Sequence, residues 1–531
     1  MSGTTVRPVT GSSRTAGAAL RRLPFSLTPA GRVIAVTTLF ALALRGYQLA
    51  RPGHLLGVGD YDDGADFGSA LRLIHGVVPY RDFVIVQPPG ITLLMTPAAL
   101  LSRVAGTAGA IAAGRILTAL AGASAVLLAG LLVRHRGVLA TLLTCGIIAI
   151  YPGGVQAAHT ILLEPWLTAF CLAGAVAVFD GDRLASGRRL AWGGAALGFA
   201  GAIKVWAIIP VAVITVLSLP RPRNAARFLA GVAAGFVIPV LPFAILGPRR
   251  FYDSVVIAQL ARTGARTPVA FRLQYLTGVT AWQPGIVVVL VVGVAIAAVV
   301  AGTLIAAWRV TGHGPPPLEW FGVATAAGVI VAFLIPVDFY YHYPGFLAPF
   351  LAIALALPAA RLLQDWPQPP ARASRAAGLR RLAVPVAGLA MLVLPVAAGS
   401  AEDSKTPTYA SALTAIDRVI PPGACVVTDQ ASLLISADRF TSSAPGCAVV
   451  VDGTGTSYAL GQGRTAVTAG SVPAVAAVWQ QAFRAARYVL LTRYNTNRIA
   501  WTAQLRAYFR DNFASVSGNW APLQLYVRKG A

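Results

Sequence analysis

Charged residues are scarce in this sequence, and acidic residues are the scarcest of them. Aspartate and glutamate together number 19 in a chain of 531 residues, against 43 lysines and arginines, and charged residues make up 12% in all. Hydrophobic residues reach 56% and the mean hydropathy is +0.67, which exceeds the apolar content of a soluble globular protein. Apolar runs close to the length of a bilayer span recur between residues 33 and 398. The sequence therefore indicates a polytopic α-helical membrane protein.

The shortage of acidic residues leaves a formal net charge of +24. In a soluble protein this charge would indicate nucleic-acid binding, but here the basic residues lie in short segments between apolar runs. That distribution is typical of membrane orientation and of contact with anionic headgroups, so the expected partner is the lipid bilayer and not nucleic acid. Richness in alanine, glycine, arginine and valine indicates a GC-rich bacterial genome, and hence a bacterial plasma membrane.

A signal-peptide region with a small-residue cleavage site is also lacking. The first 32 residues contain five arginines and no acidic residue, so residues 1–32 are expected to be a cytoplasmic N-terminus. Counting the apolar runs as alternate crossings gives about eleven transmembrane helices and places the C-terminus outside. The inferred inner segments are rich in arginine, as the positive-inside rule requires. The predicted spans are 33–49, 109–133, 137–152, 165–179, 190–203, 205–219, 228–246, 284–307, 320–336, 345–360 and 382–398.

Two stretches of the first outer loop are predicted to be interfacial helices. Residues 65–75 place apolar side chains near helical spacing, and residues 88–104 are too short and too interrupted by proline to span a bilayer. The C-terminal part, 399–531, differs from both because helical runs alternate with β-like ones. It is predicted to be a small extracytoplasmic α/β domain. Its β-like runs are ACVVTD (424–429), CAVVVDG (447–453), YVLLTRY (488–494) and LQLYVRK (523–529).

Cysteine and histidine are both rare. Four cysteines are too few for a disulfide scaffold, and Cys145 and Cys171 lie inside apolar runs, where inert packing is expected. Cys425 and Cys447 lie in the polar C-terminal part, and a disulfide between them is predicted if that part is extracytoplasmic. His342 has no second histidine or cysteine at ligand spacing, which excludes a zinc site of that kind around it.

The few acidic residues gather on the outer side of the membrane. Five aspartates lie between Val58 and Gly90, and the count of spans places them on the same side as Glu164, Lys204 and the turn 338–345. Polar groups at the ends of spans are costly unless they pair or form a site. An acidic cluster facing Lys204 and several arginines suits a substrate with both a hydroxyl and a phosphate. The five aspartates are Asp60, Asp62, Asp63, Asp66 and Asp82, of which Asp60 and Asp66 are expected to be surface residues.

The segment DDGADFGSALRLIHGVVPYRDFVIVQPPG (62–90) resembles the first-loop signature of the GT-C polyprenyl-phosphate-sugar glycosyltransferases. These include the protein O-mannosyltransferases and the aminoarabinose transferases of lipid A. In that superfamily an acidic pair precedes an interfacial helix, a G-x-x-P-Y-x-D-F element and a K-P-P element. Asp62 and Asp63 match the acidic pair and Asp82 matches the second element, whereas Gln87 stands where the superfamily usually has lysine. The similarity continues at Glu164, Lys204 and YYHYPGFLAPF (340–350).

The resemblance implies a GT-C transmembrane catalytic domain over residues 33–398 and an inverting transfer of a sugar, such as arabinose or mannose. The donor would be a polyprenyl-phosphate sugar, and the acceptor an extracytoplasmic glycan, lipid or protein of the cell envelope. A first-loop aspartate, preferably Asp62, would remove the proton from the attacking hydroxyl. Lys204 and an arginine from the loop 249–272 would stabilise the departing phosphate.

Roles for the remaining candidates stay open at this point. Asp63 and Glu164, the other expected catalytic residues, could orient the acceptor, tune the pKa of the base, or hold a divalent cation such as Mg²⁺, Mn²⁺ or Ca²⁺. Asp82 could close a turn, and Lys204 could extend its amine to the interface without touching substrate. The expected substrate-binding residues are Asp82, Lys204, Arg249, Arg250, Tyr340, Tyr341 and His342, although the arginine pair could anchor lipid headgroups and the aromatic residues could form an interfacial belt.

Two rival functions belong to other classes of protein. A transporter or flippase of lipid-linked sugars would show repeated halves with broken helices near the bilayer midplane, whereas this chain has no convincing internal repeat and places its acids in outer loops. A glycan-binding envelope protein would use the C-terminal domain as its active part and the membrane part as an anchor.

Overall fold

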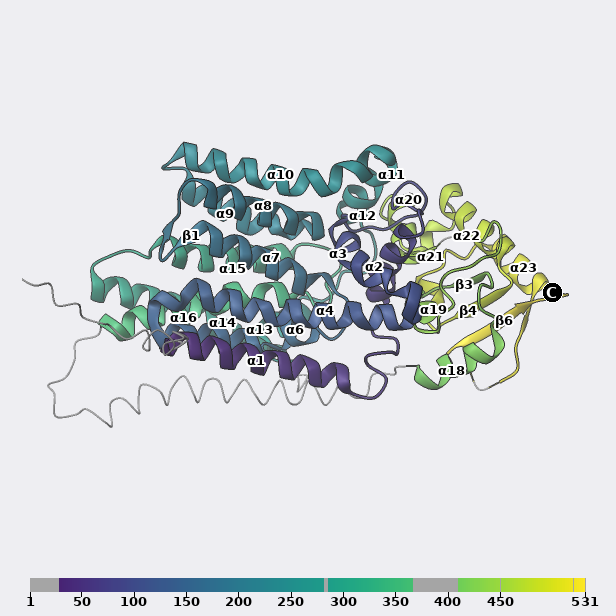
Figure 1. Cartoon of the computed structure of the whole chain (residues 1–531), viewed down its shortest axis with the longest axis horizontal. Coiled ribbons are helices and arrows are strands. Elements are labelled where there is room, and N and C mark those ends of the chain that lie inside the picture. The colour runs from purple at the N-terminus through teal and green to yellow at the C-terminus, as the bar shows by residue number, and fades with distance from the viewer. Residues whose placement is uncertain (1–27, 281–284, 366–408, 449, 519, 531) are drawn as a thin grey trace, which may run out of the picture.

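Most of the chain is helical in the computed structural model, which describes residues 28–280, 285–365, 409–448, 450–518 and 520–530. Apolar runs become helices because a helix satisfies every backbone polar group within one segment. The long helices lie side by side, and a smaller α/β domain caps one end of the bundle (Figure 1). The helices of the bundle are α1 Pro29–Ala50, α4 Ser102–Val133, α5 Gly137–Ile150, α7 Leu163–Val178, α8 Arg188–Ile203, α9 Ile208–Ser218, α10 Pro222–Leu246, α14 Ile286–Thr311, α15 Pro317–Leu334 and α16 Pro344–Asp365.

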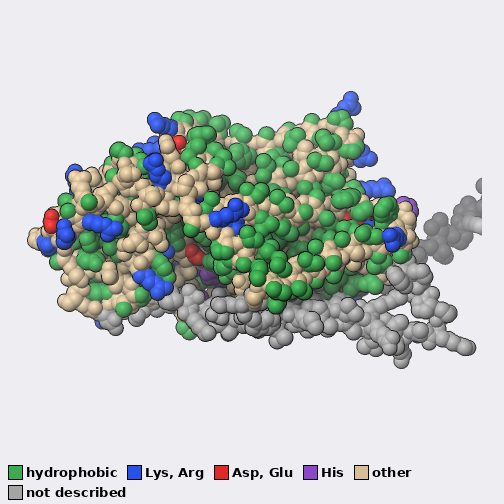
Figure 2. Space-filling model, turned by 180° about the vertical axis from the view of Figure 1, so that it is seen from behind, with side chains coloured by type: hydrophobic (Ala, Val, Ile, Leu, Met, Phe, Trp, Pro, Cys, Tyr) green, Lys and Arg blue, Asp and Glu red, His purple; other side chains and the backbone are tan. Residues whose placement is uncertain are grey.

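The bundle has the surface of a membrane protein. Within the described residues, six helical segments are long and apolar enough to cross a membrane, and hydrophobic side chains cover most of the visible bundle surface (Figure 2). Ten of the eleven predicted spans coincide in position with the helices of the bundle, and the eleventh, 382–398, lies outside the described residues. The boundary predicted at residue 399 also lies there.

Small residues bring α8 and α10 into close contact. A Cβ at Gly194 or Gly198 of α8 would lie 2.2 or 2.1 Å from a carbonyl oxygen of α10, and one at Gly231 or Gly235 would lie equally close to α8. Glycines four residues apart on each helix let the two backbones approach, as in many membrane helix pairs. This contact fixes the outer end of α8, where Lys204 follows.

The first outer loop forms two short helices, α2 (Tyr61–Leu73) and α3 (Gly90–Leu100). Helix α2 begins four residues earlier than the predicted 65–75 because the Asp60 carboxylate accepts hydrogen bonds from the backbone amides of Tyr61 and Asp62. Residues 63–71 are all buried, since α3 and α4 pack against α2 on the bundle side and the C-terminal domain covers it from the other. The helix therefore lies between two parts of the protein and not on the membrane surface.

The C-terminal domain contains a four-stranded sheet in the order β3–β4–β6–β5, in which only the β3–β4 pair is parallel. Alternate residues of β4 enter two cores. Val489 packs with Trp479 and Phe483 inside the domain, whereas Leu490 shares a core with Phe67 of α2. The elements of the C-terminal domain are α18 Ala410–Val419, β3 Val426–Thr428, α19 Ala431–Ser436, α20 Gly453–Leu460, α21 Ala466–Ala469, α22 Pro473–Ala485, β4 Tyr488–Leu491, η5 Asn495–Asn497, α23 Ala503–Asn512, β5 Phe513–Ser515 and β6 Gln524–Arg528.

The cysteine pair of this domain is joined as predicted. Cys425 and Cys447 form a disulfide, and Cys145 and Cys171 are buried free thiols in the bundle. The β-like run 447–453 forms no strand in its described residues. Val451 of this run is buried because it packs in the core shared with α2.

Hydrogen bonds tie the C-terminal domain to the first outer loop. The Gln430 side chain donates to the backbone oxygen of Asp60 at 3.2 Å, and the Arg72 guanidinium donates to the backbone oxygen of Phe440 at 3.0 Å. Helix α19 lies directly on α2 (Figure 1). The position of α2 is thus set from both sides.

Gly64→Ala is expected to lower the thermal unfolding temperature, because a Cβ at residue 64 would lie 2.1 Å from the backbone nitrogen of Ser432 in α19. Relieving this clash requires a backbone shift, and overpacking of this kind costs about 1–3 kcal/mol. Gly46→Ala in α1 is the matched control, since a Cβ there meets nothing within 4 Å. Equal unfolding temperatures for both variants in the same detergent would contradict the tight docking of α19 on α2.

Candidate functional site

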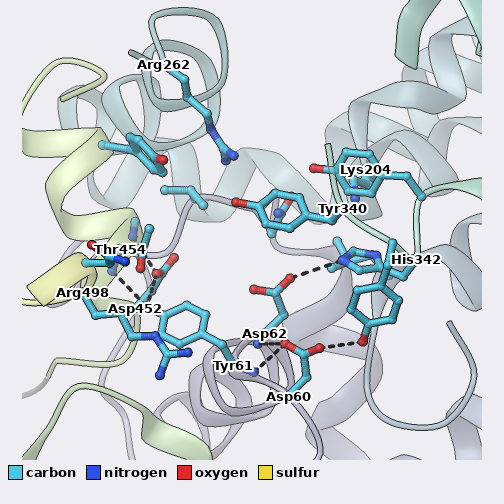
Figure 3. A pocket seen from close by; sticks show the side chains of 18 of the residues that line it. Asp60, Tyr61, Asp62, Lys204, Arg262, Tyr340, His342, Asp452, Thr454 and Arg498 are labelled. Carbon is cyan, nitrogen blue, oxygen red and sulfur yellow. Dashed lines mark hydrogen bonds and ion pairs between the residues drawn. The ribbon is translucent and has the colours of Figure 1, made fainter. Parts of the chain in front are cut away.

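A cavity of about 460 Å³ lies where the outer ends of the bundle helices meet the C-terminal domain. In the space-filling view, acidic and histidine side chains are visible in a hollow at this junction (Figure 2). Residues from both parts line it (Figure 3). The membrane part contributes Asp60, Asp62, Lys204, Arg262 and the aromatic residues 340–343; the C-terminal domain contributes Asp452, Thr454, Tyr458, Tyr494, Asn497 and Arg498.

Asp62 projects into this cavity from the first turn of α2 (Figure 3). Its carboxylate oxygen Oδ2 lies 3.7 Å from Nε2 of His342, and its side chain is 40% exposed. Withdrawal from bulk water, followed by the charge of Asp60, raises the pKa of Asp62 to about 6, although His342 opposes the shift. Asp62 is thus a carboxylate at neutral pH and a stronger base than an ordinary aspartate.

Beside Asp62 lies a buried network of alternating charge. Lys204 Nζ donates to Glu164 Oε1 at 2.6 Å, and the second oxygen of Glu164 lies 2.8 Å from His342 Nδ1. Burial alone would lower the pKa of His342, but the Glu164 carboxylate outweighs burial and raises it. The Glu164 carboxylate thus shifts the balance of His342 toward its protonated form, with Nε2 facing Asp62.

Lys204 reaches the cavity because α8 ends just before it. Lys204 has extended backbone angles, and a 3-10 turn (Val205–Ala207) leads into α9. Its amine lies 3.9 Å from the ring centre of Trp206 and 4.3 Å from that of Tyr343, so both rings stabilise the cation. The Lys204 ammonium donates a hydrogen bond to Glu164, and Lys204 also lines the cavity.

Asp63, predicted as the partner of Asp62, does not line the cavity. Its carboxylate oxygen Oδ2 accepts from Arg115 Nη2 at 2.7 Å and from Thr160 Oγ1 at 2.6 Å, and the Asp63 and Arg115 side chains are both fully buried. Successive residues of a helix point about 100° apart, so the two carboxylates serve different surroundings. The structure assigns Asp63 to packing between α2 and α4.

The pair suggested for a divalent cation does not fit that purpose. Asp63 is bound by Arg115, and Glu164 is bound by Lys204 and His342. Within the described ranges, no group of three or more His, Cys, Asp or Glu side chains is placed to hold a metal ion. No step of the proposed mechanism therefore passes through a metal.

Three predicted substrate-binding residues lie outside the cavity. Asp82 forms an ion pair with Arg81 at 2.7 Å and accepts from the Val78 amide, so it closes a turn. The Arg249 side chain is 95% exposed, and Arg250 donates to the backbone oxygen of Arg81. Asp82 and Arg250 instead border a separate cavity of about 310 Å³.

The other predicted residues meet at the main cavity, where Tyr340, Tyr341 and His342 form one wall. The Tyr341 hydroxyl donates to Asp60 Oδ2 at 2.6 Å. Asp60 is half-buried and lines the cavity. Asp66 is 2% exposed, so the expectation of a surface residue was wrong for Asp66. Asp60 is the N-cap of α2 and Asp66 lies within that helix, which starts earlier than the predicted residues 65–75.

Sequence reasoning missed the wall formed by the C-terminal domain. The Tyr61 hydroxyl donates to Asp452 Oδ1 at 2.9 Å and accepts from the Thr454 amide at 2.9 Å, and Arg498 lies 4.5 Å from the Tyr61 ring centre. Asp452 caps α20 by accepting from the Gly455 amide, and the sequence DGTGT (452–456) carries that capping signal. A helix cap does not reveal which distant residues it faces.

Comparisons with known proteins agree with this architecture. Residues 105–252 match the family model described as dolichyl-phosphate-mannose-protein mannosyltransferase, and no curated protein matches the chain by sequence. ArnT from Cupriavidus metallidurans bound to undecaprenyl phosphate has a similar structure, with a TM-score of 0.56 and 13% identity over 94% of this chain and 98% of that chain. The apo state of the same protein has a TM-score of 0.53 and 14% identity, over 94% of this chain and 98% of that chain.

A third similar structure is the archaeal oligosaccharyltransferase AglB from Archaeoglobus fulgidus, in complex with an inhibitory peptide and a dolichol-phosphate. Its TM-score is 0.50 and its identity 13%, over 94% of this chain and 74% of that chain. Fold similarity across nearly the whole chain, together with the family match, defines the class: a multi-pass membrane protein with the GT-C fold. The family match covers residues 105–252, and the likeness to the solved structures is one of fold. The predicted fold class is thereby confirmed, whereas the family match begins after the first-loop motif at residues 62–90.

Proposed function

We propose that this protein transfers a sugar, mannose or arabinose, from a polyprenyl-phosphate donor to a hydroxyl group of an extracytoplasmic cell-envelope acceptor, with inversion at the anomeric carbon. The observation that carries the proposal is the single cavity in which the Asp62 carboxylate faces the Lys204–Glu164–His342 network. A base and a cationic group on either side of one space are what a displacement at the anomeric carbon requires. Undecaprenyl phosphate in the similar ArnT structure supports the class of donor.

The mechanism follows from these positions. Asp62 removes the proton from the acceptor hydroxyl as its oxygen attacks the anomeric carbon. The bond from that carbon to the phosphate oxygen breaks, and its electron pair stays on the phosphate. Lys204 and protonated His342 stabilise the negative charge that develops there. Arg262 lines the same cavity but is paired with Asp338 at 3.2 Å, so it contributes less free charge.

The distribution of basic residues supports an extracytoplasmic location for this chemistry. Basic segments lie between the inner ends of the bundle helices, and the C-terminal domain caps the opposite end (Figure 1). The proposed location is a bacterial plasma membrane with a cytoplasmic N-terminus and an extracytoplasmic C-terminal domain. The polyprenyl tail of the donor would lie in the bilayer, with its phosphate near Lys204.

Reconstitution into proteoliposomes with a labelled polyprenyl-phosphate sugar tests the proposal. We expect label to leave the lipid and to appear on an acceptor or, more slowly, in water, with free polyprenyl phosphate as the second product. Label that crosses the vesicle membrane while still attached to its lipid would instead support the transporter. Glycan binding without donor consumption would support the envelope-binding protein.

The rate of transfer is expected to fall in acid with an apparent pKa of about 6. Asp62 acts as a base only when deprotonated, and its raised pKa of about 6 means that protonation removes activity as pH falls through that value. The value of kcat/KM should then drop about tenfold for each further pH unit. Measuring kcat/KM between pH 4.5 and 7.5, with donor binding followed in parallel, checks this fall of the rate in acid. A profile that stays flat down to pH 4.5 would rule out Asp62 as the base.

A further inference from the structure

The cavity has two chemically different walls, and Asp62 lies between them (Figure 3). Lys204, Tyr340 and His342 belong to the membrane part, whereas Asp452, Thr454 and Arg498 belong to the C-terminal domain. We propose that the second wall, defined here as Thr454, Tyr494, Asn497 and Arg498 with the ring of Tyr61, is the acceptor site and that it recognises a glycan. This assignment rests on the proposed transferase function.

The geometry of displacement decides which substrate meets which wall. An inverting transfer needs the nucleophile and the leaving group on opposite faces of the sugar ring. The phosphate is tied to a bilayer tail, so it belongs near Lys204, at the end of the membrane helix α8. The acceptor hydroxyl must then approach Asp62 from the opposite side, where the C-terminal domain lies (Figure 3).

The side chains of this acceptor wall suit a ligand with many hydroxyl groups. The Tyr494 ring is 40% exposed, and Arg498 lies 5.3 Å from its centre and 4.5 Å from that of Tyr61. Asn497 is exposed and lines the cavity together with Thr454. An amide both donates and accepts, as sugar hydroxyls do, and tyrosine rings offer apolar faces of the kind that line small-ligand sites.

A peptide acceptor fits this wall less well. Extended peptides are commonly bound by adding a strand to an exposed sheet edge. None of the residues lining the cavity belongs to a described strand; the acceptor wall comes from the start of α20 and the loop around η5. The wall therefore offers side-chain donors, acceptors and rings but no row of backbone partners.

The test uses the full chain in proteoliposomes with labelled polyprenyl-phosphate mannose or arabinose. Three acceptors are compared: mannose and arabinose oligosaccharides, a peptide rich in serine and threonine, and water alone. Asn497→Ala and Tyr494→Ala are expected to raise KM for the oligosaccharide about tenfold, the effect of losing one hydrogen bond or one ring contact. The KM for the donor should change much less than the KM for the oligosaccharide. Thr496→Ala, an exposed residue of the same loop outside the cavity lining, is the matched control.

Unchanged oligosaccharide KM in both variants would overturn the assignment, as would transfer to the peptide with none to the oligosaccharides. Both results leave the transferase function in place. If the wild-type protein consumes no donor with any acceptor, including water, the proposed function fails and the acceptor site fails with it. Both variants alter exposed side chains, and a thermal unfolding scan of each verifies the fold.

Discussion

Asp62→Asn is expected to lower kcat for sugar transfer by about 10²–10⁴-fold, the usual contribution of a positioned general base. The amide keeps the size of the carboxylate but cannot take a proton. Donor binding and thermal unfolding should change little, because the nearest ionic contact of Asp62 is 3.7 Å away at His342 and the residue is 40% exposed. The rate is measured in proteoliposomes with labelled polyprenyl-phosphate sugar.

Asp511→Asn provides the matched control, because this aspartate is exposed on α23 and lines no part of the cavity. Its turnover should equal that of the wild type. A turnover of Asp62→Asn within about threefold of the control would exclude Asp62 as the general base. Asp60, the cap of α2, would then be the remaining carboxylate from this segment that lines the cavity.

Asp63→Ala is expected to act on stability, with a loss of about 3–5 kcal/mol in the free energy of unfolding. The Arg115 guanidinium, fully buried, would lose its carboxylate partner and keep only neutral ones, namely Thr160 and the backbone oxygens of His54 and Leu55. An uncompensated buried charge is far more costly than an exposed one. Denaturant or thermal unfolding in detergent measures the loss.

A second substitution separates the effect of charge from that of packing. Combining Asp63→Ala with Arg115→Met removes the orphaned charge, so the double variant should regain much of the lost stability. Equal instability of the single and double variants would show that the ion pair is not the cause. Opposite behaviour of neighbouring aspartates, one affecting turnover and the other stability, is the specific expectation from their different surroundings.

Hydropathy was sufficient to predict the bundle. The runs that became α1, α10 and α14 are long, apolar and bounded by polar residues, so length and composition alone locate them. The same reasoning placed Glu164, Lys204 and His342 at one end of the bundle, and the structure joins them in one network. Local sequence suffices where membrane thickness is the dominant constraint.

Local sequence was not sufficient where long-range packing decides. Residues 65–75 were predicted as the first interfacial helix, but the Asp60 cap starts α2 at Tyr61, and this shift separates Asp62 from Asp63. Tyr61, whose ring belongs to the acceptor wall, donates a hydrogen bond to Asp452, which lies 391 positions further along the chain. The run 447–453 was predicted as a strand because its sequence is apolar and β-like, yet Val451 is buried against the outer-loop helices.

The docking of α19 on α2 has a consequence for the maturation of this protein. The helix that presents Asp62 lies in an early loop, but one of its faces is covered by residues after 408. The helices of the bundle and the cavity wall formed by the C-terminal domain therefore come from separate parts of the chain. The proposed reactive centre is complete only when the last quarter of the chain has folded against the bundle.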